Sequence, residues 1–124
     1  MTNEVEPCTF CAIARRESPA YVIFEDDSTI AFAALSPVCV GHTLLIPKIH
    51  VANLFELADE QAAALGLTAK STAMVLRARH QVNALNLLHA SGQEAQQSVF
   101  HFHEHLVPRR LHDGLDMWLR TVDR

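Results

Sequence analysis

The sequence lacks the features of a membrane protein and of a nucleic-acid-binding protein. No apolar run approaches the roughly 20 residues that a helix needs to cross a bilayer, so we expect no membrane partner. Positive charge is scarce, with 10 Lys+Arg against 14 Asp+Glu and a formal net charge of −4. Because nucleic-acid-binding surfaces are basic, we expect no nucleic-acid partner. The opening MTNEVEPC carries acids instead of the basic start of a secretory signal, so the expected location is the cytoplasm.

Cysteine is also scarce, and no segment divides the chain. Three cysteines are fewer than a small disulfide-bonded scaffold uses. There is no repeat, low-complexity run or Pro/Gly-rich linker, so residues 1–124 are predicted to form a single domain. The composition, 49% hydrophobic and 19% charged, is that of a globular protein. A chain of this length leaves much of its surface unburied, and a dimer would cover more of it.

What the sequence does contain is a series of short apolar runs and one long helical pattern. A helix is predicted over residues 59–80, with Asp59 as its N-cap. Its buried face is predicted from apolar spacings of three and four, at Ala62, Leu65, Ala69, Thr72 and Leu76. Strands are predicted over residues 21–24, 29–35, 44–46, 86–88 and 98–107. Together these elements indicate an α+β fold, an antiparallel sheet with one long helix on a face.

Histidine is the unusual residue, because three of the eight histidines fall within five positions. On a strand, His101, His103 and His105 would all point to one face, about 6.5–7 Å apart. Imidazole can act as nucleophile, base or acid near neutral pH, so the three rings suit a site around a phosphate. They could instead be ligands of a catalytic metal, or packing residues that each need a buried partner.

A second candidate site is the pair Cys8 and Cys11. Thiolate and imidazole together suit tetrahedral zinc, and His50 is a candidate third ligand. A lone CxxC is also compatible with a redox pair. The sequence has no second CxxC, so a zinc finger is not expected. His42, at the start of the strand 44–46, would by itself be a capping or surface residue.

Three stretches of the sequence together resemble the histidine-triad (HIT) family. The run QSVFHFHEHLVPR, from Gln97 to Arg109, resembles the family's signature of histidines alternating with apolar residues. SPVCVGHTLLIPKIH and CTFCAIARRE resemble two further family segments in the same order. The resemblance covers residues 8–109, and residues 110–124 form a C-terminal tail whose place the pattern does not determine.

The resemblance implies a fold, an activity and a ligand. The fold would be a HIT-like α+β sheet of about five antiparallel strands with two helices, extended across a homodimer. The activity would be that of a phosphoramidase-like hydrolase or transferase that attacks the α-phosphorus of a small nucleotidyl compound. Motif positions make His103 the nucleophile, which would form a covalent intermediate, while His105 would hold the phosphate or protonate the leaving group.

The same motif positions imply the remaining site residues. His42 matches a further active-site histidine, and Gln97 and Ser98 match a pair that contacts the phosphate and the leaving group. The implied zinc ligands are Cys8, Cys11, His50 and His101. Four protein ligands leave no open position on the metal, so the zinc would be structural.

Four residues depart from the family's pattern. Ala34 stands where an Asp or Asn usually binds the ribose hydroxyls, Ala90 replaces an Asn, and Gln96 replaces a Gly. These three indicate an altered or relaxed substrate choice, and they favour the alternative of a non-catalytic or weakly active nucleotide-binding or regulatory protein. Glu104 replaces an apolar residue on the face opposite the three histidines. A buried unpaired carboxylate is costly, so we expect Glu104 to reach solvent, a basic group or a dimer partner.

Overall fold

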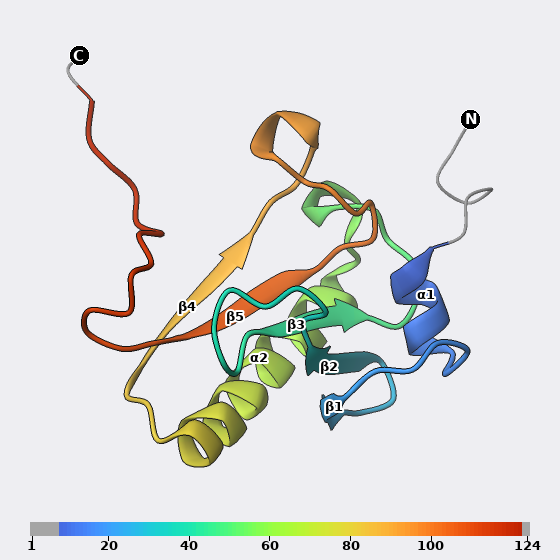
Figure 1. Cartoon of the computed structure of the whole chain (residues 1–124). Helices are drawn as coiled ribbons and strands as arrows, with labels where there is room; N and C mark the ends of the chain where they lie inside the picture. Colours follow the sequence, from blue (N-terminus) through green and yellow to red (C-terminus); the bar gives the residue numbers. More distant parts are fainter. Residues whose placement is uncertain (1–7, 123–124) are drawn as a thin grey trace.

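A five-stranded antiparallel sheet forms the centre of the structure (Figure 1). The computed structural model describes residues 8–122. The strands lie in the order β1-β2-β3-β5-β4. The elements are α1 (Thr9–Ala14), β1 (Val22–Glu25), β2 (Thr29–Ala33), β3 (Thr43–Pro47), α2 (Asp59–His80), β4 (Ala84–His89) and β5 (Glu104–Arg109), with short 3-10 turns at Leu54–Glu56 and Gln93–Ala95. This arrangement confirms the predicted α+β fold with five strands and two helices.

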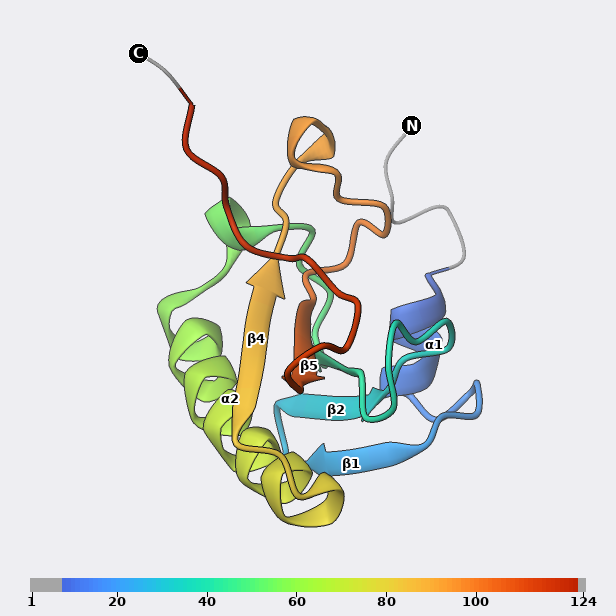
Figure 2. The same cartoon turned by 60° about the vertical axis from the view of Figure 1, so that its left-hand side comes forward.

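The long helix α2 covers one face of the sheet (Figure 2). It spans Asp59 to His80 as predicted, although its N-cap is Ala58, one residue earlier than expected. Four of the five residues predicted for its buried face are buried, and the fifth, Ala62, is exposed. The α2-side core joins α2 to β2, β3 and β5 through Ala31, Leu45, Leu65, Ala69, Leu76, Phe102 and Leu106.

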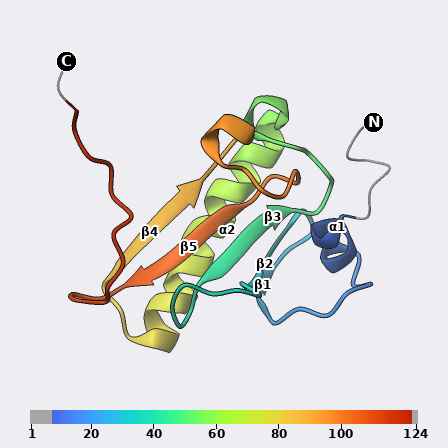
Figure 3. The same cartoon turned by 45° about the horizontal axis from the view of Figure 1, so that its top comes forward.

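The short helix α1 packs on the opposite face of the sheet, as Figures 2 and 3 show. Phe10 and Ile13 are its buried residues. They pack with alternate residues of β2 and β3 to form the α1-side core, which also contains Ile30, Phe32, Leu44 and Ile46. Because strand side chains alternate between faces, residues in register with Leu44 lie on this α1 side. No helix within residues 8–122 is both long enough and apolar enough to cross a membrane.

The last strand is shorter than predicted. A strand was expected over residues 98–107, but β5 begins only at Glu104. The preceding residues take hydrogen-bond partners from a loop instead of a strand, since the Phe102 N–H donates to the Val51 carbonyl at 2.6 Å. His101 and His103 therefore lie before the strand, and alternation alone does not determine where they point.

The C-terminal tail leaves the sheet after β5 without forming a helix or strand within residues 110–122. Arg109 fixes its beginning. The Arg109 guanidinium donates to both carboxylate oxygens of Asp113, to the Asn86 side chain and to the Leu115 carbonyl. Beyond this anchor Trp118 is 74% exposed, so the tail is bound to the sheet only near its start.

Glu104 lies on the α2 side, as expected, but one of its oxygens is buried. In register, Glu104 is paired with Leu45, a member of the α2-side core. Among the described residues, its Oε1 has no hydrogen-bond partner. The expectation that the carboxylate reaches solvent or a basic group is therefore not met at this oxygen. Burial raises the pKa of Glu104.

Replacing Glu104 by Gln is expected to raise the free energy of unfolding at pH 8 by about 1 kcal/mol, after allowance for partial exposure. A raised pKa means that the folded state binds the proton more tightly than the unfolded chain. This contribution to stability is present below the unfolded pKa and is lost as pH rises through the folded pKa. Urea unfolding at pH 5 and pH 8 should show a larger gain at pH 8. A variant less stable than the wild type at pH 8 would mean that the carboxylate is paired.

Candidate active site

The three histidines gather on the α1 side of the sheet. His105 is in register with Leu44 of β3, which belongs to the α1-side core. The ring of His103 lies 5.2 Å from that of His105, centroid to centroid, in an edge-to-face arrangement. Phe10 of α1 meets the His103 ring at 5.2 Å as well. The His101 ring also meets Phe10, at 5.9 Å. The expectation that the three rings share one face thus holds although His101 and His103 precede the strand.

His42 lies directly beside His105. The Val38 N–H donates to His42 Nδ1 at 3.1 Å, so this nitrogen is the acceptor of the ring. In a neutral imidazole the other nitrogen then carries the hydrogen. His42 Nε2–H accordingly donates to His105 Nδ1 at 3.0 Å. The same reasoning leaves His105 with its hydrogen on Nε2, where it can be donated to a bound ligand.

Gly41 is required where the chain turns into His42. Its φ of +91° is a conformation that L side chains rarely adopt. A Cβ there would also lie 2.9 Å from the His80 ring and 3.0 Å from Pro108. The turn therefore depends on glycine, and it places His42 at the start of the chain of imidazole hydrogen bonds.

His103 has the opposite tautomer. Its Nδ1 lies 2.9 Å from the His101 main-chain oxygen, and a carbonyl can only accept. Nδ1 therefore carries the hydrogen, and Nε2 keeps a free lone pair that can act as a nucleophile. The site thus presents a bare nitrogen on one ring and an N–H donor on the next ring, which is the pairing that nucleophilic displacement with leaving-group protonation needs.

Burial keeps these histidines neutral. It lowers the pKa of His42 and of His103. The pKa of His105 falls to about 4, through burial first and then through the neighbouring His103 and His42. Neutral rings at physiological pH agree with the tautomers assigned from the hydrogen bonds, since a charged imidazole has no lone pair for attack.

The four predicted metal ligands come together at the N-terminal end of α1. The ligand atoms of Cys8, Cys11, His50 and His101 all lie within 4.8 Å of one another. Sγ of Cys11 is 3.3 Å from His50 Nδ1 and 3.4 Å from His101 Nδ1. A tetrahedral zinc site with Zn–S of about 2.3 Å and Zn–N of about 2.0 Å has S–N edges of about 3.5 Å. The donor set and its spacing therefore fit a tetrahedral ion.

The surroundings of the cluster also fit a metal. His101 Nε2–H donates to the Pro47 carbonyl at 2.8 Å, which leaves Nδ1 bare and directed at the sulfur atoms. A carbonyl that fixes the ring of a ligand in this way is common around bound zinc. Burial, together with the neighbouring Cys8, raises the pKa of Cys11 to about 11. A cation between the sulfurs would lower the pKa of Cys11 instead, because it favours the thiolate.

Gln97 and Ser98 differ in their placement. The Gln97 side chain is buried, and its amide is fully engaged with main-chain groups. It donates to the carbonyls of Ala52 and Val99 and accepts from the Gly92 N–H. Ser98, next in sequence, is exposed. In this structure Gln97 therefore joins two loops, while the hydroxyl of Ser98 is open to the surface.

Two residues of the neighbourhood were not predicted from the sequence. Phe10 lies edge-on to His101 and His103 and so joins the Cys2His2 cluster to the second of the three histidines. His89, the last residue of β4, contacts the main-chain oxygen of His103 through Nδ1 at 2.8 Å. The sequence signal for His89 was weak, since a single histidine at a strand end has many possible roles.

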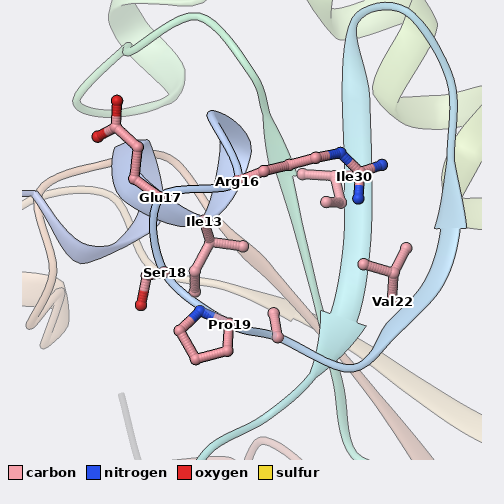
Figure 4. A pocket seen from close by; sticks show the side chains of 8 residues that line it. Ile13, Arg16, Glu17, Ser18, Pro19, Val22 and Ile30 are labelled. Atoms are coloured by element: carbon pink, nitrogen blue, oxygen red, sulfur yellow. The ribbon is translucent and has the colours of Figure 1, made fainter.

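The structure also shows an open cleft of about 390 Å³ between the loop after α1 and the strands β1 and β2 (Figure 4). Its apolar wall includes Ile13 and Ile30, two members of the α1-side core that also contains Phe10. Arg16, Glu17 and Ser18 supply its polar rim. A second cleft, of about 240 Å³, reaches Ala34 and His42 beneath the loop between β2 and β3.

Alternating histidines on one face of an α+β sheet, next to a Cys2His2 cluster, define a histidine-triad type of site. The chain belongs to the HIT family, because the family model described as HIT domain matches residues 15–112. It is 39% identical over 104 residues to the Bacillus subtilis protein named Protein hit, an alignment that covers 84% of this chain and 72% of that protein.

Two other similar proteins bear on the site. The crystal structure of a Zn-bound histidine triad family protein from Mycobacterium smegmatis matches with a TM-score of 0.83 and 36% identity, covering 94% of this chain and 84% of that chain. The Arabidopsis thaliana protein named Adenylylsulfatase HINT3 is 34% identical over 108 residues, covering 87% of this chain and 55% of that protein.

Long-range ¹H–¹⁵N spectra at pH 7 are expected to show His42 and His105 with the hydrogen on Nε2, and His103 with it on Nδ1, because each tautomer follows from a fixed acceptor. His105 should stay neutral down to about pH 5, since burial and its neighbours lower its pKa to about 4. The exposed His112 is an internal reference for a ring on the surface. Protonation of His105 at pH 6.5 would contradict the assignment.

Proposed function

We propose that the protein is a hydrolase that cleaves a nucleotidyl phosphoramidate, or a related phosphoester, through a covalent intermediate on His103. The observation that carries this proposal is the pairing of opposite tautomers. His103 offers a bare Nε2. His105 offers an N–H on Nε2, because His42 donates a hydrogen bond to the other ring nitrogen of His105. Membership of the HIT family and the enzyme name of the Arabidopsis relative support the hydrolase class.

In the first step, the lone pair of His103 Nε2 would attack the α-phosphorus. The bond from phosphorus to the leaving nitrogen breaks, and that nitrogen takes the electron pair and the proton of His105 Nε2. The negative charge that this leaves on the His105 ring is balanced by the positive charge on the His103 ring, whose centroid lies 5.2 Å away. The positive charge that develops on the His103 ring is stabilised by the His101 carbonyl, because the Nδ1–H donates more strongly from a charged ring.

In the second step, water would attack the phosphorus of the nucleotidyl-histidine. His105 Nε2, now without its hydrogen, accepts a proton from that water. The bond from phosphorus to His103 Nε2 breaks, and the monophosphate leaves. Both rings then return to the tautomers of the resting site. The two displacements replace a single difficult displacement, and each has a lower barrier than that single step.

We also propose that Cys8, Cys11, His50 and His101 hold a structural zinc ion. When bound, the ion would contribute stability and no reaction chemistry, since four protein ligands leave no open position. The cluster links the start of α1 to the residue whose carbonyl orients His103. The third alternative, in which His101, His103 and His105 share one catalytic metal, conflicts with the engagement of both ring nitrogens of His101. Its Nδ1 lies beside the sulfurs of Cys8 and Cys11, and its Nε2 donates to the Pro47 carbonyl.

The proposed substrate is a small nucleotide-like molecule that is recognised with less reliance on the ribose. The side chain of Ala34 is a methyl group that packs against the α1-side core. It therefore has no acceptor for ribose hydroxyls. Gln96 keeps a backbone with φ of +75°, the conformation that the glycine of this motif would favour. The turn before the histidines therefore keeps its shape, and the departures change the groups available to the substrate instead of the reaction centre.

The second candidate function is a HIT-fold nucleotide-binding or regulatory protein without useful turnover. The observation that favours it is the engagement of the Gln97 amide by main-chain groups, which leaves that side chain without a free donor for a leaving group. The two candidates differ in turnover, so the activity of the purified protein separates them.

We further propose a homodimer that extends the sheet through β4. β4 is an edge strand, so one side of its main chain is unpaired. Leu87 on β4 is 50% exposed, and Met74 on the neighbouring helix α2 is 52% exposed. A second copy placed along this edge would cover apolar side chains and main-chain hydrogen-bonding groups together.

The purified protein is expected to release AMP from adenosine 5′-phosphoramidate, and His103→Ala is expected to lower the rate by about a thousandfold or more, because it removes the nucleophile. Release can be followed by chromatography of the products. Exposed His112→Ala is the matched control and should keep the wild-type rate. If the folded wild type releases no AMP, while AMP still binds, the binding alternative is correct.

Zinc should be retained by His103→Ala and lost by Cys11→Ser, since only the second change removes a proposed ligand. Elemental analysis of the purified proteins gives the metal content directly. Cys11→Ser, or the wild type treated with a chelator, should also lose roughly 10 °C in Tm. Loss of zinc from His103→Ala would support the catalytic-metal alternative.

A further inference from the structure

His89 lies where three segments meet next to the proposed nucleophile. It is the last residue of β4 and is in register with Glu104, the first residue of β5. Figure 1 shows the end of β4 beside the segment that leads into β5. The His89 ring stacks on Phe102, with centroids 4.3 Å apart and planes 26° from parallel. The side chain is thus placed by packing as well as by its hydrogen bonds.

The main chain of His103 lies just outside the sheet. The ladder between β4 and β5 ends at the pair of His89 and Glu104, one residue short of His103. The hydrogen bond from His89 Nδ1–H to the His103 carbonyl, at 2.8 Å, continues the connection between the two strands by one residue. A side chain therefore does at His103 what main-chain pairing does in the rest of β5.

Ser91 fixes the orientation of the His89 ring. Because the His103 carbonyl can only accept, the hydrogen of His89 lies on Nδ1, and Nε2 is an acceptor. Ser91 Oγ hydrogen-bonds to that Nε2. The same hydroxyl oxygen accepts from the Leu54 N–H at 2.9 Å, so its hydrogen is free for His89. Both ring nitrogens are thereby engaged, and the loop 53–56 is connected to the nucleophile.

We infer that His89 is a positioning residue for the proposed reaction, which holds the His103 main chain in place for attack, and that Ser91 holds His89. The inference rests on the proposed role of His103 as the nucleophile. Attack on phosphorus needs the Nε2 lone pair aligned with the bond that breaks, and small displacements of a reacting group lower a rate sharply. His89 would therefore affect turnover more than substrate affinity.

Four variants test the inference with adenosine 5′-phosphoramidate as the probe. His89→Leu removes the hydrogen bond, and kcat is expected to fall about tenfold with KM nearly unchanged. His89→Asn keeps an N–H near the position of Nδ1–H, so its kcat is expected to stay within about threefold of the wild type. Ser91→Ala should lower kcat by a smaller factor. Gln93→Ala, a change at an exposed position of the same loop, is the control.

The combined variant of His89→Leu with Ser91→Ala tests whether the two residues act together. If Ser91 acts only through His89, the double variant loses no more kcat than His89→Leu alone. If the loss of kcat in the double variant equals the product of the two single losses, the role of Ser91 would be overturned. Equal losses in His89→Asn and His89→Leu, or an unchanged kcat in His89→Leu, would overturn the role of His89.

One measurement tests the inference without turnover. Long-range ¹H–¹⁵N spectra of the wild type at pH 8 are expected to show the His89 hydrogen on Nδ1. A hydrogen on Nε2 would break the bond to His103 and overturn the inference, whether or not AMP is released. A wild type without activity but with the Nδ1–H tautomer would instead contradict only the proposed function, and the contact between His89 and His103 would stand.

Discussion

The site depends on how the segment His101–His103 is held without being part of a strand. The Phe102 N–H binds the Val51 carbonyl, and the His101 ring binds the Pro47 carbonyl. Both acceptors belong to the end of β3 and the loop that follows it. The segment therefore has a fixed path although the sheet ladder begins only at Glu104. The proposed zinc ligand His101 and the proposed nucleophile His103 both take their positions from this path.

This path explains why sequence patterns predicted some elements well and the last strand poorly. The helix spacing of α2 was sufficient to predict Asp59–His80, because a 22-residue helix repeats its pattern many times. The alternation over residues 98–107 was interpreted as one strand, since alternate side chains do occur on one face. Alternation does not reveal where the hydrogen-bond partners come from, and here the first partners belong to a loop.

The candidate site was predictable mainly through the family resemblance. Cys8 and His101 are 93 positions apart, and no local pattern predicts that they meet. The motif positions predicted four metal ligands, and the fold does bring these four residues together. The hydrogen bonds of Gln97 were beyond prediction because they depend on the relative placement of two loops. The contact of His89 with His103 was beyond prediction because it depends on where the ladder between β4 and β5 ends. The buried oxygen of Glu104 likewise depends on how α2 covers β5.

The acceptor that sets the His103 tautomer is a main-chain carbonyl, and this determines which substitutions can change the tautomer. A carbonyl is present whatever side chain occupies position 101, so no single substitution removes the acceptor itself. The His105 tautomer instead depends on a second side chain, and any mutation of His42 to an apolar residue releases it. In a lineage under weak selection, the tautomer of His105 would therefore be lost through more single substitutions than the tautomer of His103.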